Sequence, residues 1–307
     1  GELAVMAATL GLAVALSRTP PPAEDAETSW IALQVGYHVP PLQGAGLLTE
    51  VRPDLFILVT LAGAGLLYAA EVRRLRRRGT AWPVRRALRW YAGLGVLAVA
   101  LLSGVGAYGR VMFSVHAVQF LAITVVAPLL LAGAAPITLG RSALGLPRPE
   151  GAGRWLTHPA VGFLAYALPV PLFHFTGWFV LAQWSYAVHV ATVAVFLCAG
   201  FLYFPPAVPL GAGNRLRLLI AGLPVHLLLA AALMDGPVVG EGWYLQLGLM
   251  WASPGGAGGG RAAETLALAA DQRVGAVLGG TGAALIFLAV LVLLWLRDRK
   301  GRRSAEH

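Results

Sequence analysis

Eight apolar stretches constrain the fold of this chain more than any other feature of its sequence. They lie at about 3–17, 54–71, 90–107, 112–134, 159–180, 185–205, 216–234 and 274–296. A helix that rises about 1.5 Å per residue needs about 20 residues to cross about 30 Å of hydrocarbon, and several of the stretches approach that length. Hydrophobic residues make up 58% of the 307 residues and charged residues only 12%, which excludes an ordinary soluble domain. The sequence therefore predicts an all-α, polytopic membrane helix bundle.

The basic residues predict how this bundle is oriented. If the arginine-rich segment 73–89 is cytoplasmic and the spans alternate, 18 of the 23 Lys and Arg fall on the cytoplasmic side, the basic tail included. Cytoplasmic loops of helical membrane proteins carry such an excess of Lys and Arg. We therefore expect a cytoplasmic C-terminus, and we attribute the net charge of +9 to topology and not to nucleic-acid binding.

The first residues differ from the rest of the chain. Residues 1–17 are apolar but lack the basic start of a signal peptide, and residues 18–30 carry three prolines and three acids, which cannot continue a membrane helix. We expect 1–30 to be the last helix and linker of an upstream membrane domain, followed by a membrane domain at 31–300 and a cytoplasmic basic tail at 301–307. The sequence shows no phosphate-binding glycine loop, nucleophile elbow or membrane carboxylate pair, so it does not predict an enzyme.

Four histidines fall within apolar spans, and the predicted topology places all of them towards the outer side. They are His116, His174, His189 and His226. An imidazole inside a bilayer is costly without a partner, a cavity or a metal, and neutral imidazole is a ligand for copper, zinc and iron. The histidines therefore indicate a metal site drawn from several helices. The alternative is that each one only hydrogen-bonds a neighbouring helix.

Three more side chains could assist such a site. Met112 lies one turn before His116 and could add a soft thioether for Cu(I), or it could simply pack. Gln119 could orient an imidazole or connect two helices. Asp271 lies near the predicted start of the last helix, where it could orient an imidazole or cap that helix.

The order of the motifs from about residue 38 to 300 resembles the CtaG-type cytochrome c oxidase assembly factor family. The matching pieces are LLTEVRPDLF, RRLRRRGTAWPV, FSVHAVQFLAITVVAPLLLAGAAPITL, the His-Pro pair at 158–159, GFLYFPP, PVHLLLAAALM and DQRVG. The resemblance implies seven membrane helices, here with one preceding helix, and a role in maturing a copper-containing oxidase of the bacterial cytoplasmic membrane. The leading segment resembles the end of a CopD-like copper-resistance domain, which implies a fused protein.

The resemblance also implies a ligand set for copper. His116 and Gln119 match the first His and the Gln of the family's His-x-x-Gln-His motif. His189 matches the first of a histidine group on the sixth helix, and His226 matches the His before Ala-Leu-Met. We therefore expect His116, His189 and His226 to hold copper as Cu(I), with Gln119, His174, Met112 and Asp271 as auxiliary residues.

This chain departs from the family pattern at three positions. Phe120, Val193 and Val195 stand where further histidines are usual, so any metal site here has fewer imidazoles than the family type. The resulting hypothesis is a metallochaperone in the lipid bilayer that loads copper into the oxidase subunit carrying the copper B centre, alongside the upstream CopD-like domain. Three alternatives are a ligand-free structural partner of the oxidase, a copper transporter acting with the upstream domain and a b-haem membrane cytochrome.

Overall fold

The computed structural model describes residues 35–36, 39–40, 42–43, 45–145, 158–204, 212–247 and 261–303, of which 212–218, 261–264, 294 and 297–303 are described for the backbone only. The chain divides into two compact units, Gly1–His38 and Val39–His307. The fold below is that of the second unit. The predicted upstream helix and linker at 1–30 lie outside the described residues.

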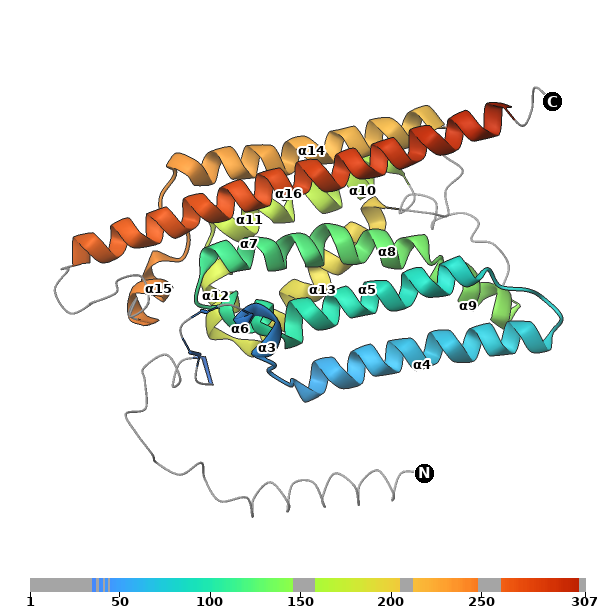
Figure 1. Ribbon diagram of the computed structural model, residues 1–307, viewed down its shortest axis with the longest axis horizontal. Coiled ribbons are helices and arrows are strands. Elements are labelled where there is room, and N and C mark those ends of the chain that lie inside the picture. The colour runs from blue at the N-terminus through green and yellow to red at the C-terminus, as the bar shows by residue number, and fades with distance from the viewer. Residues whose placement is uncertain are drawn as a thin grey trace, which may run out of the picture. The chain divides into compact units, whose positions relative to one another are not determined.

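Every regular element in the described ranges is a helix (Figure 1), which confirms the predicted all-α fold class. The helices are α3 (Gly46–Thr49), α4 (Leu55–Arg77), α5 (Val84–Leu102), α6 (Gly104–Tyr108), α7 (Phe113–Leu121), the π-helix η1 (Ala122–Val126), α8 (Ala127–Gly133), α9 (Pro136–Leu144), α10 (Pro159–Ala167), α11 (Pro169–Phe175), α12 (Trp178–Trp184), α13 (Tyr186–Tyr203), α14 (Ala212–Asp235), α15 (Glu241–Leu247) and α16 (Arg261–Arg303). The long helices run side by side: α4 packs on α5, α5 on α8, α7 on α16, and α16 on α14 (Figure 1).

Four helices in the described residues are long and apolar enough to cross a membrane. They are Leu55–Arg77, Phe113–Leu144, Tyr186–Tyr203 and Thr265–Leu293. A fifth span results if Pro159–Phe175 and Trp178–Trp184, which meet at an angle of 75°, are taken as one broken span. The polytopic membrane character is therefore confirmed, whereas the predicted number of membrane helices is not.

Two predicted spans are interrupted in the structure. The stretch 90–107 divides at Ser103, whose hydroxyl accepts a hydrogen bond from Val105 N at 3.2 Å and so caps α6. The stretch 159–180 is broken between α11 and α12, where Thr176 has an extended backbone. A side-chain cap in the first stretch and an extended residue in the second therefore divide segments whose hydropathy is continuous.

The predicted start of the last helix is wrong. We expected it near Asp271, but α16 begins at Arg261 and has 43 residues. Residues 261–270 contain five Ala and two Leu, which favour helix, and this composition indicates that the helix begins before the apolar stretch.

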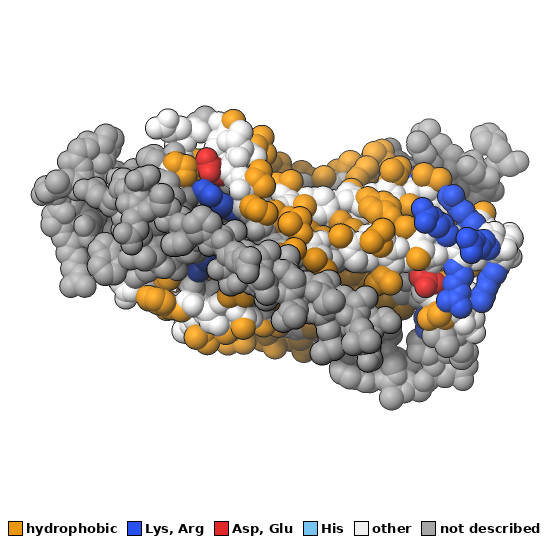
Figure 2. Space-filling model, turned by 90° about the horizontal axis from the view of Figure 1, so that it is seen from below, with side chains coloured by type: hydrophobic (Ala, Val, Ile, Leu, Met, Phe, Trp, Pro, Cys, Tyr) orange, Lys and Arg blue, Asp and Glu red, His pale blue; other side chains and the backbone are white. Residues whose placement is uncertain are grey.

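The arginine side chains of the segment 73–89 lie together at one end of the second unit (Figure 2). There the Arg86 guanidinium lies 4.7 Å from the Trp82 ring, and Trp82 Nε1 donates to the Tyr68 hydroxyl at 2.9 Å. The Tyr68 hydroxyl in turn donates to the Ala134 carbonyl at 3.1 Å, so one chain of contacts links α4, α5 and the end of α8. Helix α7 begins at the opposite end (Figure 1).

Candidate metal-handling site

Helix α7, which carries His116, is capped by a side chain from the last helix. The Asp271 carboxylate on α16 accepts hydrogen bonds from Phe113 N at 2.6 Å and Ser114 N at 3.3 Å. Met112, which precedes the helix, provides no side-chain cap. A carboxylate at a helix N-terminus satisfies free N–H groups and complements the helix dipole. The alternative in which Asp271 caps its own helix is therefore wrong, because Asp271 caps a helix that precedes it by more than 150 residues.

Gln272, which follows Asp271 in the DQRVG motif, has a structural role that the sequence did not predict. Gln272 is 2% exposed, and its Nε2 donates to the carbonyls of Leu233 and Pro237 at 3.0 and 3.1 Å. Its Oε1 accepts from Val239 N at 2.7 Å. Gln272 on α16 therefore holds the end of α14 and the turn that follows it by three hydrogen bonds. The sequence did contain an indication of this role, because an amide side chain stands next to Asp271 in a helix that is apolar over most of its length.

We expect Asp271→Ala to destabilise the protein by about 1 kcal/mol, the usual effect of losing a helix N-cap. Asp271→Asn keeps an acceptor oxygen and should lose less. The thermal unfolding midpoint of the detergent-purified chain measures both variants. Asp235→Ala, which removes an exposed carboxylate, serves as the control. Equal stability of Asp271→Ala and the wild type would contradict the capping role.

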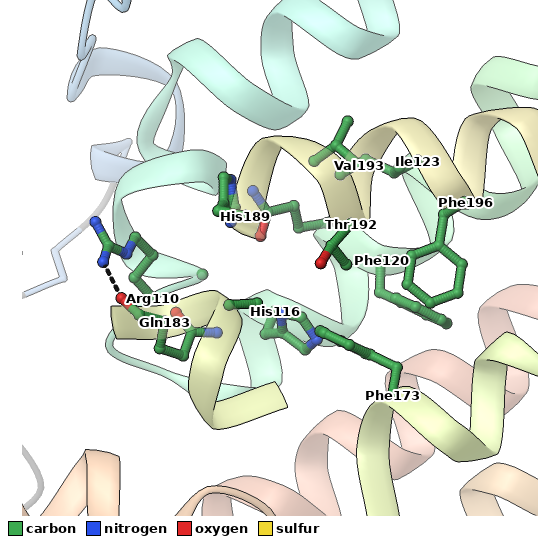
Figure 3. Close-up of a pocket in the computed structure, with 13 residues that line it drawn as sticks. Arg110, His116, Phe120, Ile123, Phe173, Gln183, His189, Thr192, Val193 and Phe196 are labelled. Carbon is green, nitrogen blue, oxygen red and sulfur yellow. Dashed lines mark hydrogen bonds between the residues drawn. The ribbon is translucent and has the colours of Figure 1, made fainter. Parts of the chain in front are cut away.

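His116 and His189 line the same cavity, which we call the His116 cavity (Figure 3). It encloses about 440 Å³ of space free of atoms, part of it open to the outside. Its described lining is formed by Gly109, Arg110, His116, Gln119, Phe120, Ile123, Phe173, Ala182, Gln183, His189, Thr192, Val193 and Phe196. His116 comes from α7 and His189 from α13, so two spans distant in sequence each contribute one imidazole.

His116 Nε2 and Gln183 Oε1, both in this cavity wall, are buried and have no hydrogen-bond partner among the described residues. Buried polar groups in proteins nearly always have a hydrogen-bond partner. Two such atoms without a partner in one cavity wall therefore point to a bound group or an ordered water. Arg110 lies beside them and donates to the Gln183 carbonyl at 2.5 Å (Figure 3).

The other two membrane histidines line a second cavity, the His226 cavity, of about 320 Å³. His174 Nδ1 lies 2.8 Å from the Val170 carbonyl oxygen. A carbonyl only accepts, so Nδ1 carries the proton and Nε2 keeps the lone pair. His226 Nε2 lies 2.5 Å from the Tyr166 hydroxyl. His226 on α14 thus has a partner on α10, as the interhelical alternative expects, whereas His174 bonds a carbonyl of its own helix α11.

The structure divides the predicted copper ligands between these two cavities. His116 and His189 share one cavity, whereas His226 lies with His174 in the other. Among the residues that the structure describes, no three His, Cys, Asp or Glu side chains lie close enough to hold one metal ion. The ring of Phe120 lines both cavities, with its centroid 4.8 Å from that of His174 and 6.0 Å from that of His116. Metal binding by these histidines stays a prediction.

The auxiliary residues have structural roles. Gln119 Nε2 donates to the Ala100 carbonyl at 2.9 Å and so joins α7 to α5. Met112 is the half-buried residue that precedes α7, and Asp271 is the cap of that helix. Of the two alternatives for Gln119, interhelical bonding is therefore the one that the structure shows.

Comparisons with known proteins agree with this architecture. The chain is 31% identical over 312 residues to the uncharacterized protein Mb0105 of Mycobacterium bovis, which covers 91% of this chain and 44% of the relative. It is 28% identical over 304 residues to the uncharacterized protein ML1998 of Mycobacterium leprae, which covers 88% of this chain and 43% of the relative. The chain thus spans less than half the length of these relatives. No solved structure matches it.

The family comparison is specific. The family model described as cytochrome c oxidase caa3 assembly factor (Caa3_CtaG) matches residues 66–300, from the middle of α4 to the end of α16. The matched region contains both cavities and every histidine of the membrane spans. Because this match extends over most of the sequence, the chain belongs to the cytochrome c oxidase caa3 assembly factor family.

Proposed function

We propose that the chain assists cytochrome c oxidase assembly by handling copper in the His116 cavity. The membership in an assembly factor family supports the oxidase as the partner. We place the protein in a bacterial cytoplasmic membrane with its C-terminus cytoplasmic, because the arginine-rich end lies opposite the end at which α7, the helix of His116, begins (Figure 1). The His116 cavity then faces the outer side, and the oxidase subunit that carries the copper B centre would receive the metal there.

The single observation that carries the proposal is the buried, unpaired Nε2 of His116 in a cavity that His189 also lines. A buried imidazole nitrogen without a hydrogen bond is unfavourable unless something binds it. Copper bound there is cargo, and the protein's contribution is to position two imidazoles, exclude most water and leave an opening for transfer. The open part of the cavity supplies that opening.

Copper loading tests the proposal. The detergent-purified chain is loaded anaerobically with Cu(I), desalted and analysed for copper and protein. We expect about one copper per chain in the wild type and none above background in His116→Ala/His189→Ala, because both imidazoles of the cavity are then gone.

His158→Asn is the matched control. His158 caps α10, its Nδ1 accepting from Ala160 N, and asparagine keeps a capping acceptor. This variant should bind as much copper as the wild type. Wild-type protein that retains no copper above background would contradict copper handling. The alternative of a ligand-free structural partner of the oxidase would then be favoured.

A further inference from the structure

We propose that the arginine-rich end of the bundle binds the headgroups of anionic phospholipids in the membrane leaflet that it meets. The surface that binds them, which we call the arginine surface, consists of Arg73, Arg74, Arg76, Arg77, Arg78, Arg85, Arg86 and Arg89. Figure 2 shows basic side chains together at this end. The arginine surface shares no residue with the His116 cavity, so the inference is independent of copper handling.

The positive charge of the arginine surface has little compensation within the protein. Residues 71–89 contain eight arginines and one acid, Glu71, which gives this segment a net charge of +7. Among the residues that the structure describes, no carboxylate forms an ion pair with any of the eight arginines. Seven of the eight side chains are exposed, and Arg86 is half-buried beside the Trp82 ring. The surface therefore has guanidinium groups available for an anion from outside the described chain.

The positions of the arginines along their helices add to the repulsion between them. Arg73 and Arg77 on α4 stand four residues apart, and so do Arg85 and Arg89 on α5. Like charges at this spacing destabilise a helix. Arg85 also lies in the first turn of α5, where the helix dipole disfavours a cation. An anion bound beside these side chains reduces both unfavourable effects.

The backbone beneath the arginine surface is held in one conformation. The chain turns after α4 at Gly79, whose φ of +76° is in the left-handed region, and Thr80 N donates to the Leu75 carbonyl at 3.2 Å. Trp82 is 8% exposed and packs in one core cluster with Tyr68 and Leu75. Binding to groups on an ordered backbone costs less conformational entropy than binding to a flexible loop.

An exposed apolar face lies next to the arginines and favours a lipid over other anions. Val84, Leu88 and Tyr91 on α5 are 62, 63 and 46% exposed, and their spacing of four and three residues places them on one helix face. Arg85 and Arg89 directly follow Val84 and Leu88 in the chain. An anionic phospholipid matches both features, since its phosphate meets the guanidinium groups and its acyl chains meet the apolar face. Free phosphate or an acidic protein segment matches only the charge.

Guanidinium chemistry suits the phosphate group of such a lipid. A guanidinium can donate two parallel N–H hydrogen bonds to phosphate oxygens, and it carries five N–H donors in total. Arg89 uses Nη1 for the Gly133 carbonyl at 3.3 Å, which fixes the side chain and leaves its other donors for a ligand. Clusters of about four to eight basic residues immediately beside a membrane helix are typical of sites for anionic lipids.

Native mass spectrometry of the full 307-residue chain tests the inference. The chain is purified in detergent, delipidated and titrated separately with dioleoylphosphatidylglycerol and dioleoylphosphatidylcholine, whose acyl chains are the same. We expect the wild type to bind phosphatidylglycerol at least about 10-fold more tightly, because phosphatidylcholine has no net charge. Inorganic phosphate at millimolar concentration should not displace phosphatidylglycerol, since it cannot bind the apolar face.

Two variants assign the binding to the arginine surface. Arg85→Gln removes one exposed guanidinium and should weaken phosphatidylglycerol binding about 5-fold, and Arg77→Gln/Arg85→Gln should weaken it about 30-fold. Arg273→Gln is the matched control for the single change. Arg273 is also exposed, but it follows the Asp271 cap of α7 and so lies at the opposite end of the bundle (Figure 1). This control should bind phosphatidylglycerol as the wild type does.

Each contrary result contradicts a defined part of the inference. Equal affinity of the wild type for the two lipids contradicts a site for anionic headgroups, and this comparison needs no variant to fold. Displacement of phosphatidylglycerol by inorganic phosphate contradicts the lipid and indicates a site for free phosphate. Equal losses in Arg85→Gln and Arg273→Gln contradict the assignment to the arginine surface. None of these measurements involves copper, so a failure of the proposed copper handling remains distinguishable.

Discussion

Alanine at position 104 is expected to destabilise the bundle by about 3 kcal/mol, at the upper end of the range for overpacking. An added Cβ on Gly104 would lie 2.2 Å from the Gly46 carbonyl oxygen and 2.6 Å from the Leu47 Cα. Both are backbone atoms, so no side chain can rotate to make room, and α3 must move away from α6. A lowered midpoint of thermal unfolding in detergent, followed by tryptophan fluorescence, measures the effect.

Gly95→Ala is the control for that substitution. Gly95 lies within α5, and no atom comes within 4 Å of the position that its Cβ would occupy. Alanine there should leave the midpoint unchanged or raise it, because alanine favours helix over glycine by about 1 kcal/mol. Equal midpoints for the two variants would contradict the close approach at Gly104.

Gln272→Leu is expected to have an effect of similar size. Leucine is apolar and cannot replace the three hydrogen bonds of Gln272, so Val239 N and the carbonyls of Leu233 and Pro237 lose their partner. Each buried polar group left unpaired costs about 1–3 kcal/mol, so the total should reach about 3 kcal/mol. The temperature at which half of the protein remains monodisperse in size-exclusion chromatography measures the loss.

The matched control is Gln246→Leu on α15, where the glutamine is exposed. This change also replaces an amide by an apolar side chain but unpairs no buried group, so the transition temperature should stay within the error of the wild type. If both variants lose the same stability, the buried hydrogen bonds of Gln272 are not the cause.

The sequence predicted the features that depend on local chemistry. The apolar stretches identified the spans Leu55–Arg77 and Tyr186–Tyr203 to within a few residues. Asp54, a residue type typical of helix N-caps, directly precedes the first of these spans, and its Oδ1 accepts from Ile57 N at 3.0 Å. These predictions hold because hydrophobicity and helix capping act over a few residues that are adjacent in the chain.

Features that depend on packing between distant helices could not be predicted from the sequence. Nothing near His226 in the chain indicates that Tyr166, 60 residues away, occupies its Nε2. The division of the histidines between two cavities depends on how α7, α11, α13 and α14 turn towards one another. The π-helix η1 adds to the difficulty, because its wider turn changes the face on which later residues of the same span lie.

The cap that Asp271 places on α7 also affects the order in which the protein can mature. A ribosome delivers the chain from its N-terminus, so α7 enters the membrane long before α16 has been synthesised. Until then the amides of Phe113 and Ser114 lack their acceptor, and the turn that leads into His116 is incomplete. The first turn of α7, three residues before His116, is therefore capped only when the last helix inserts.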